Sequence, residues 1–255
     1  MEEYEVPAIR EVLDLSGENV LVTGASGNIG RGIATRLAEA GATVVAHYRH
    51  NEAAAKELIA GIGSGTTVCA DLTDEASMRG MLESSSATML VNNAAVQTVQ
   101  SLAEMSFVEW RQMMAANLDS AFLLTQCMAE RWMATDRGGV IVNIGSIEGL
   151  DPAEGHGHYA TSKAGLLMLS RAAALEFGKA GIRINTVSPG LIDREGLAEE
   201  WPDGVNRWLD RAPLGRVGTP NDVADAVLFL LSPAARWISG ANLVVDGGMS
   251  TQGKW

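Results

Sequence analysis

A tyrosine and a lysine stand four residues apart in the segment Tyr159-Ala160-Thr161-Ser162-Lys163. On a helix this spacing places both side chains on one face. A phenol can exchange a proton with a substrate oxygen, but its usual pKa of about 10 makes it a slow base at neutral pH. Because a nearby cation stabilises the phenolate, we expect Lys163 to lower the pKa of Tyr159 and prepare it for acid/base catalysis.

A serine and an asparagine precede this pair. Ser146 follows the apolar run at 139–144, and Asn117 lies in a long helical pattern from about 104 to 133. A serine hydroxyl at the end of a strand can bind a carbonyl oxygen and hold it near Tyr159. Each residue taken alone has an ordinary alternative, as a cap, a turn residue or a solvated side chain. Their joint occurrence favours a site that moves a proton to or from a carbonyl or alcohol oxygen.

Short apolar runs alternate with helical patterns along the chain. Apolar runs without polar alternation indicate strands that are covered on both faces, and strict β–α alternation predicts a parallel, doubly wound α/β sheet. The predicted strands are 19–23, 43–47, 66–70, 88–91, 139–144, 182–187 and 242–245, and the predicted helices are 28–40, 52–60, 74–83, 104–133, 159–179 and 222–231. A long irregular segment at 189–219 predicts a lid or binding loop inside one domain that spans 1–255.

A glycine-rich turn links the first strand to the first helix, in the sequence Thr23-Gly24-Ala25-Ser26-Gly27-Asn28-Ile29-Gly30. Gly24 permits a tight turn, and Gly30 permits close approach of the helix to the strand or to a ligand. The free N–H groups and positive dipole end of a helix N-terminus suit a pyrophosphate. This strand–turn–helix context favours nucleotide binding over a plain connecting turn.

The end of the second strand indicates which nucleotide binds. An NAD site usually carries an acidic residue there, which binds the ribose 2′-hydroxyl. The chain has Arg49 instead, and Glu52 comes too late. A charged hydrogen bond of roughly 1.5–3 kcal/mol from Arg49 to a 2′-phosphate would favour NADP(H) over NAD(H) by about 10- to 150-fold. The alternative is a solvated surface arginine.

These motifs resemble the short-chain dehydrogenase/reductase family over about 19–248. The resemblance rests on T-G-x-x-x-G-x-G, with Asn28 in place of the second glycine, on Asn92-Asn93-Ala94-Ala95, on Y-x-x-x-K and on Val245-Asp246-Gly247-Gly248. It implies a three-layer Rossmann-type fold with a central seven-stranded parallel sheet. It also implies nicotinamide-dependent oxidation or reduction, and dimers or tetramers formed through the fourth and fifth helices.

Through this resemblance each candidate residue receives a role. The catalytic set is Asn117, Ser146, Tyr159 and Lys163, in which Asn117 kinks its helix and holds a water that relays protons to Lys163. The expected cofactor-binding residues are Gly24, Ser26, Asn28, Ile29, Gly30, Arg49, Asp71, Leu72, Asn93, Ala94, Tyr159, Lys163, Pro189, Gly190 and Ile192.

Three segments are expected to line the substrate pocket: the residues after Ala95, the stretch 147–158, and a flap at about 191–212. The candidate substrate residues are Ser146, Glu148, His156, Arg194 and Trp208. Pro202 suits the first turn of a helix in the flap, with Val205, Trp208 and Leu209 on its inner face. Arg194 either meets an anionic group or faces solvent. His156 and His158 have no evident third metal ligand, which leaves substrate orientation or loop packing.

The polar side chains expected in the substrate pocket favour a small polar carbonyl or alcohol as the substrate. The nearest alternative is a 3-oxoacyl-thioester reductase of the acyl-carrier-protein type. A non-catalytic nicotinamide-nucleotide-binding or sensing protein would be expected to lose part of the catalytic set, and an isomerase, racemase or dehydratase would retain its cofactor without net oxidation.

Composition limits the classes of partner that the chain is expected to bind. The chain has 255 residues with 47% hydrophobic content and a net charge of −12, which disfavours nucleic acids and anionic membranes. No apolar run reaches the ~20 residues of a membrane span, and the acidic start Met1–Glu5 is unlike a secretory signal. Cys69 and Cys127 lack metal-type spacing, and Cys69 is expected to be a buried apolar residue. A cytoplasmic enzyme without a metal is therefore predicted.

Overall fold

The computed structural model describes residues 7–251, so the acidic start at Met1–Glu5 lies outside the described residues. Seven parallel strands form one sheet in the order β3-β2-β1-β4-β5-β6-β7. They are β1 (Asn19–Val22), β2 (Thr43–Tyr48), β3 (Gly65–Cys69), β4 (Met89–Asn92), β5 (Gly139–Ile144), β6 (Ile182–Pro189) and β7 (Asn242–Val245). The predicted seven-stranded, doubly wound parallel sheet is confirmed.

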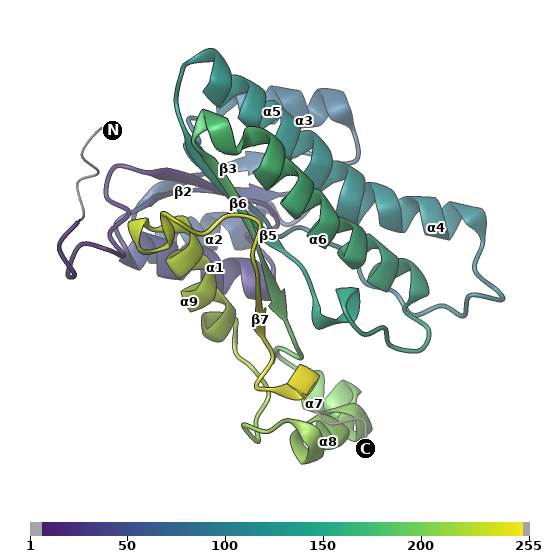
Figure 1. Ribbon diagram of the computed structural model, residues 1–255. Helices are drawn as coiled ribbons and strands as arrows, with labels where there is room; N and C mark the ends of the chain where they lie inside the picture. The colour runs from purple at the N-terminus through teal and green to yellow at the C-terminus, as the bar shows by residue number, and fades with distance from the viewer. Residues whose placement is uncertain (1–6, 252–255) are drawn as a thin grey trace.

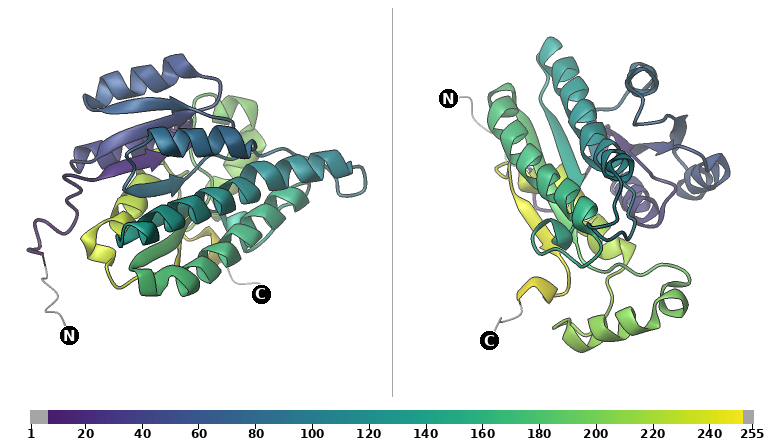
Figure 2. Two further views of the ribbon diagram at one scale, coloured as in Figure 1. Left: turned by 90° about the horizontal axis from the view of Figure 1, so that it is seen from above. Right: turned by 90° about the vertical axis from the view of Figure 1, so that its right-hand side faces the viewer.

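Helices cover both faces of the sheet (Figures 1 and 2). One layer contains α1 (Asn28–Glu39), α2 (Glu52–Ile62) and α9 (Pro220–Leu231). The other contains α3 (Glu75–Ser84), α4 (Phe107–Met114), α5 (Ser120–Ala134) and α6 (Gly157–Phe177). Two short helices, α7 (Leu197–Glu200) and α8 (Pro202–Arg211), lie beyond the carboxyl end of the sheet.

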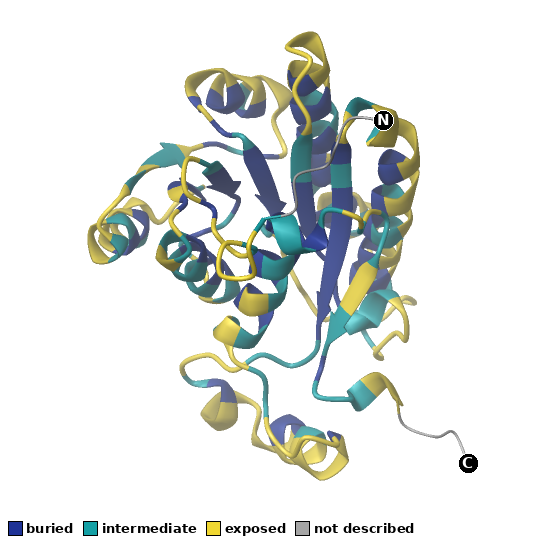
Figure 3. Cartoon of the chain, turned by 60° about the vertical axis from the view of Figure 1, so that its left-hand side comes forward, coloured by how far each residue is buried: buried dark blue, intermediate teal, exposed yellow. Residues whose placement is uncertain are grey.

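Alternating strand residues supply the two halves of the core. In β1, Val20 and Val22 pack with α1 and α9, whereas Leu21 packs on the opposite face with α3 and α5. The inner strands β1, β4, β5 and β6 are mostly dark blue in Figure 3, since most of their residues are buried, whereas the edge strands β3 and β7 are teal and yellow. Burial of both faces explains why the strand sequences are apolar without alternation.

β1 lies between β2 and β4: strands β2 and β3 follow on one side of β1, and strands β4 to β7 follow on the other. Open α/β sheets bind ligands at such a switch point, at the carboxyl ends of the strands. The glycine-rich turn after β1, Arg49 after β2 and Asn93 after β4 all lie at this edge. The topology therefore gathers the predicted cofactor residues into one region.

Three local expectations need correction. The helical pattern at 104–133 begins only at Phe107, where Ser106 and Glu109 form a capping box, and a π-helical turn (Ala115–Asp119) separates α4 from α5. Cys69 is exposed, because β3 is an edge strand with a neighbour on one side only. Leu209 is 39% exposed and does not share the inner face with Val205.

No helix within residues 7–251 combines the length and the apolar character needed to cross a membrane. Within the same part of the chain, no group of three or more His, Cys, Asp or Glu side chains is arranged to hold a metal ion.

Candidate active site

The serine and tyrosine of the predicted catalytic set meet at the end of β5. Ser146 follows the strand, and its hydroxyl accepts the backbone N–H of Glu148 at 3.1 Å. Tyr159 lies in the first turn of α6, and the neighbouring Ser146 hydroxyl lowers the pKa of its phenol. Both side chains are buried. Two neighbouring hydroxyls can both contact one carbonyl oxygen.

The ammonium of Lys163 lies one helical turn beyond the tyrosine. Its Nζ donates to the Ile144 carbonyl at 2.8 Å and lies 5.6 Å from the centre of the Tyr159 ring. The residue is 3% exposed and has no carboxylate partner within residues 7–251. Burial lowers the pKa of Lys163 to about 8. A buried, uncompensated lysine is costly to the fold, which points to a functional role.

The pKa of Tyr159 moves in the direction opposite to our expectation. Burial of the phenol is the largest cause and raises this pKa to about 12; the Ser146 hydroxyl lowers it, and the negative charge of Glu148 raises it further. The expected lowering is therefore wrong: desolvation of the phenolate is the dominant cause, and Lys163 is not among the groups that shift this pKa.

Asn117 lies in the π-helical turn and clamps the segment that follows β4. Its Oδ1 accepts the backbone N–H of Val96 at 2.8 Å, and its Nδ2 donates to the Val96 carbonyl at 2.8 Å. π-Helical turns occur often at functional sites. This two-way clamp positions the backbone beside the catalytic residues.

The glycine-rich turn has the shape that a dinucleotide needs. Gly24 adopts φ +63°, and a Cβ on Gly30 would lie 2.3 Å from the Gly24 carbonyl oxygen, so side chains are excluded at both positions. Among the described residues, no side chain caps α1 at Gly27, and its first N–H groups remain available. The residues therefore fit a nicotinamide dinucleotide, with the pyrophosphate at the N-terminus of α1.

The segment after β4 supports the turn. The Asn93 amide donates to the Thr23 carbonyl at 2.8 Å, and the Thr23 hydroxyl accepts the backbone N–H groups of Asn93 and Ala94 at 2.9 and 3.0 Å. These bonds join the ends of β1 and β4 at the expected cofactor site.

His47 is a site residue that our sequence analysis used only as the end of a strand. It is buried, its Nδ1 accepts the backbone N–H of Gly24 at 3.0 Å, and its Nε2 lies 3.1 Å from the Ala70 carbonyl. Nε2 is therefore protonated and Nδ1 is not, which describes a neutral ring. Burial lowers the pKa of His47. A histidine within an apolar strand was the available signal.

Arg49 and Asp71, both expected to bind cofactor, contact each other. The Arg49 guanidinium is 2.6 Å from the Asp71 carboxylate, which also accepts from the backbone and the hydroxyl of Thr73. These Thr73 bonds are the main reason that the pKa of Asp71 is lowered. Arg49 is half exposed, so a phosphate has access to it.

The base of the predicted flap contacts the glycine-rich turn. The Asn28 side chain donates to the Asp193 carbonyl at 2.6 Å. Ile192 pairs with Gly218 in an isolated bridge, so the start of the flap lies beside the segment that precedes α9. Gly190 is close to the Trp208 ring, since a Cβ there would lie 2.6 Å from it.

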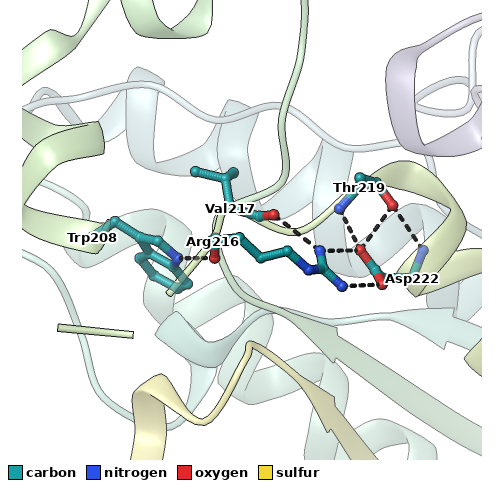
Figure 4. A network of polar contacts seen from close by, with 5 residues as sticks. All are labelled: Trp208, Arg216, Val217, Thr219 and Asp222. Carbon is teal, nitrogen blue, oxygen red and sulfur yellow. Dashed lines mark hydrogen bonds and ion pairs between the residues drawn. The ribbon is translucent and has the colours of Figure 1, made fainter. Parts of the chain in front are cut away.

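The flap is anchored at its far end by the network in Figure 4. The Trp208 indole donates to the Arg216 carbonyl at 3.3 Å, and the Arg216 guanidinium holds the Asp222 carboxylate through two bonds of 2.7 Å. Asp222 also forms a capping box with Thr219 at the start of α9. Arg194 pairs with Glu200 inside the flap. Neither the Trp208 nitrogen nor the Arg194 guanidinium is directed at the catalytic residues by these bonds.

The polar substrate candidates form two separate contacts. His156 Nδ1 lies 2.7 Å from Glu148 Oε2, and Glu148 Oε1 accepts from Gln97 at 3.3 Å. His158 turns instead to the Thr98 hydroxyl at 2.8 Å. The two histidines therefore do not form a joint metal site.

Residues 24–250 match a family model described as enoyl-(acyl carrier protein) reductase. Galactitol 2-dehydrogenase (L-tagatose-forming) of Cereibacter sphaeroides is 36% identical, over 94% of this chain and 97% of its own. A 3-oxoacyl-(acyl-carrier-protein) reductase of Vibrio harveyi is 36% identical, over 93% and 99%. A 3β-hydroxysteroid dehydrogenase of Eggerthella lenta is 33% identical, over 93% and 95%.

Solved structures agree with these relatives. A short-chain type dehydrogenase/reductase from Mycobacterium marinum has a TM-score of 0.88 at 34% identity, covering 96% of this chain and 100% of its own. A candidate 2-deoxy-d-gluconate 3-dehydrogenase from Agrobacterium tumefaciens, with bound NADP, has a TM-score of 0.88 at 32% identity, covering 94% and 99%. The chain therefore belongs to the short-chain dehydrogenase/reductase family, oxidoreductases that act on hydroxyl and carbonyl groups.

Proposed function

We propose that this chain is an NADP(H)-dependent oxidoreductase that interconverts a carbonyl and a secondary alcohol on a small polar substrate. One observation carries the proposal: the Ser146 hydroxyl lies close enough to the Tyr159 phenol to lower its pKa, with the Lys163 ammonium 5.6 Å from the centre of the phenol ring, at the edge of the sheet that holds the glycine-rich turn. This arrangement places a proton donor and a cation where a carbonyl oxygen can be bound.

The proposed chemistry assigns each residue a task. A nicotinamide held at this site would supply the hydride for carbonyl reduction, or accept it in alcohol oxidation. Ser146 donates a hydrogen bond to the carbonyl oxygen, and Tyr159 donates its proton to the same oxygen as the hydride arrives. The positive charge of Lys163 stabilises the phenolate that remains, and Asn117 holds the adjoining backbone at Val96 in place.

The cofactor residues retain their predicted roles in this proposal. The pyrophosphate would be held by Gly24, Ser26, Asn28, Ile29 and Gly30, with support from Pro189, Gly190 and Ile192. The adenosine end would be held by Arg49, Asp71 and Leu72, and the nicotinamide half by Asn93, Ala94, Tyr159 and Lys163. We propose NADP(H) because Arg49 is half exposed and can exchange its Asp71 partner for a 2′-phosphate. The neighbour with bound NADP supports this choice, and NAD(H) remains the alternative.

Arg49 offers a direct test of cofactor choice. Arg49→Gln is expected to raise the KM for NADPH by about 10- to 150-fold, because a charged hydrogen bond contributes roughly 1.5–3 kcal/mol. The KM for NADH should change by less than about threefold. An equal effect on both cofactors would show that Arg49 does not bind the 2′-phosphate.

The substrate class rests on the polar pair Glu148 and His156 beside Tyr159 and on the polyol-oxidising relative. The acyl-thioester reductase alternative is supported by the relative from Vibrio harveyi. We also propose that the segment 191–212 is a substrate flap within one domain spanning 1–255. The alternative of a non-catalytic nucleotide-binding protein is disfavoured because the chain has all four residues of the expected catalytic set.

Assembly into a homodimer or homotetramer is proposed from exposed apolar side chains on the helices of one layer. Phe107 on α4, Phe122 on α5, and Met168 and Leu175 on α6 are all exposed. Surfaces of this kind mark protein interfaces.

The net charge of −12 disfavours nucleic acid and anionic membranes as partners. Two free cysteines are compatible with the cytoplasm that we propose.

The function is tested by following NADPH and NADH oxidation in parallel with ketoses, diketones, β-ketoacyl thioesters, aromatic ketones and steroids. The proposal expects turnover with polar carbonyl compounds and faster rates with NADPH. Turnover confined to acyl thioesters would favour the reductase alternative, and cofactor binding without turnover on any class would favour the binding protein.

A further inference from the structure

A carboxylate–histidine pair lies beside the proposed acid/base. Glu148 follows Ser146 by two residues, and His156 precedes Tyr159 by three. Their side chains are 2.7 Å apart and each is 17% exposed. The ring of His156 stands edge-on to the Tyr159 ring, with 6.2 Å between centres. This pair is therefore a largely buried part of the wall next to the phenol.

The hydrogen bonds define which atoms remain available. A carboxylate only accepts hydrogen bonds, so His156 Nδ1 is the donor and, in the neutral ring, Nε2 is an acceptor. No residue within 7–251 meets Nε2. Glu148 has about four lone-pair sites, and Gln97 and His156 use one each. The Glu148–His156 pair beside Tyr159 therefore has hydrogen-bond acceptors that no residue within 7–251 uses.

The charge of Glu148 acts on Tyr159, the proposed acid/base. Its negative charge raises the pKa of the Tyr159 phenol, so the carboxylate and the phenol lie close enough to interact. That charge opposes phenolate formation in the same way whichever substrate is bound, so its effect on Tyr159 does not select between substrates. It attracts hydrogen-bond donors and repels anions, which are effects on the substrate rather than on the chemistry.

We propose that Glu148 and His156 select the substrate by binding a second hydroxyl group close to the reacting carbon. The preferred substrate class is then a neutral polyhydroxylated compound, a polyol or its ketose. Compounds without the second hydroxyl leave the acceptors unpaired, and a site built to bind a hydroxyl discriminates strongly against such analogues. Sugar acids, which carry a carboxylate, are repelled by Glu148. This inference rests on the proposed function, because it names the substrate class of the same site.

The test measures kcat/KM in the oxidative direction with NADP⁺ for three probes: galactitol, gluconate and cyclohexanol. For the wild-type chain, galactitol should exceed cyclohexanol by at least about 100-fold, because buried acceptors remain unpaired with the latter. Galactitol should exceed gluconate by at least about tenfold, because the carboxylates repel each other.

Two variants separate the contributions of the pair. Glu148→Gln keeps the size of the side chain but removes the charge, and should raise the gluconate-to-galactitol ratio at least about tenfold. His156→Phe keeps a ring beside Tyr159 but removes the acceptor, and should lower the galactitol-to-cyclohexanol ratio at least about tenfold. His156→Gln restores an acceptor and should recover at least about threefold of that loss. In both His156 variants the effect should fall mainly on KM. In Glu148→Gln the effect is judged from the ratio between substrates, because the pKa of Tyr159 also changes. Cofactor affinity should be unchanged in each variant.

Glu154→Gln is the matched control, since Glu154 is an exposed carboxylate in the same segment. It should leave both ratios within about twofold of wild type. The inference is overturned if the wild-type chain prefers gluconate or cyclohexanol, if both ratios shift by less than these amounts, or if the control shifts them equally. Absence of turnover with every carbonyl and alcohol compound would instead overturn the proposed function.

Discussion

The side-chain amide of Asn28 donates a 2.6 Å hydrogen bond to the main-chain carbonyl of Asp193. Asn28 belongs to the glycine-rich turn, and Asp193 lies in the flap 165 residues later. The resembled family usually has glycine at the position of Asn28. This departure from the family pattern therefore provides a link between the expected pyrophosphate site and the base of the flap.

Loss of this link should loosen the flap. Asn28→Ala removes one exposed hydrogen bond, which contributes about 0.5–1.5 kcal/mol, or roughly 2- to 13-fold in the equilibrium between closed and open flap. We expect limited proteolysis between 194 and 216 to accelerate by about this factor. Ser26→Ala, in the same turn, is the control. Equal protection of Asn28→Ala and the wild type would show that the bond does not restrain the flap.

His47 should make the cofactor site sensitive to acid. Burial lowers the pKa of His47 below its usual 6.5. As pH falls through about 6.5 the unfolded chain takes up this proton before the folded chain does, so stability is lost at lower pH. Protonation of Nδ1 would also break the bond from the Gly24 N–H.

His47→Leu isolates this effect. At pH 7.5 it should destabilise the chain by about 1–3 kcal/mol, because the Gly24 N–H loses its acceptor. Between pH 7.5 and 5.5, however, urea unfolding should show a smaller loss of stability in the variant than in the wild type. The exposed His50, changed to Gln, should retain the full loss. Identical pH dependence of His47→Leu and the wild type would contradict this account.

Lys163 should weaken the fold while serving catalysis. A lysine pKa held at about 8 instead of 10.5 corresponds to about 3 kcal/mol of destabilisation of the charged form. Lys163→Met should therefore increase the free energy of unfolding at pH 7 by about 1–3 kcal/mol, after loss of the bond to Ile144, and should abolish turnover.

The sign of the pH dependence follows from this lowered pKa. Between pH 8 and 10.5 the folded chain has released the proton and the unfolded chain still holds it, so wild-type stability from this group rises with pH. The gain from Lys163→Met should accordingly shrink toward pH 10.5 in urea titrations. Lys179→Met, at an exposed lysine, should show no such gain. A variant less stable than the wild type at pH 7 would refute the interpretation.

The sequence predicted the strands and helices well, because burial on both faces imposes apolar runs that are visible in a single chain. The bounds of β5 and β7 agree with the prediction residue for residue. Cys69 was misplaced because a strand's apolar pattern does not reveal whether it lies at the sheet edge.

The candidate site was harder to predict where its contacts join distant segments. Nothing in the local pattern indicated that Arg49 pairs with Asp71, or that the amide of Asn28 reaches Asp193. The pKa of Tyr159 was expected to fall because spacing alone revealed the nearby lysine. Spacing could not reveal how deeply the phenol is buried, which is the dominant cause of its rise.

The central claim is that Tyr159 exchanges the proton while a bound nicotinamide exchanges the hydride. It is tested most directly with Tyr159→Phe, by fluorescence titration with NADPH and by kcat on the best carbonyl substrate. We expect the Kd for NADPH to stay within about twofold of wild type, and kcat to fall by about 10²–10⁴ with loss of the acid/base. A variant that keeps more than about a tenth of the wild-type kcat would contradict the account, because the loss of a required proton donor cannot be that small.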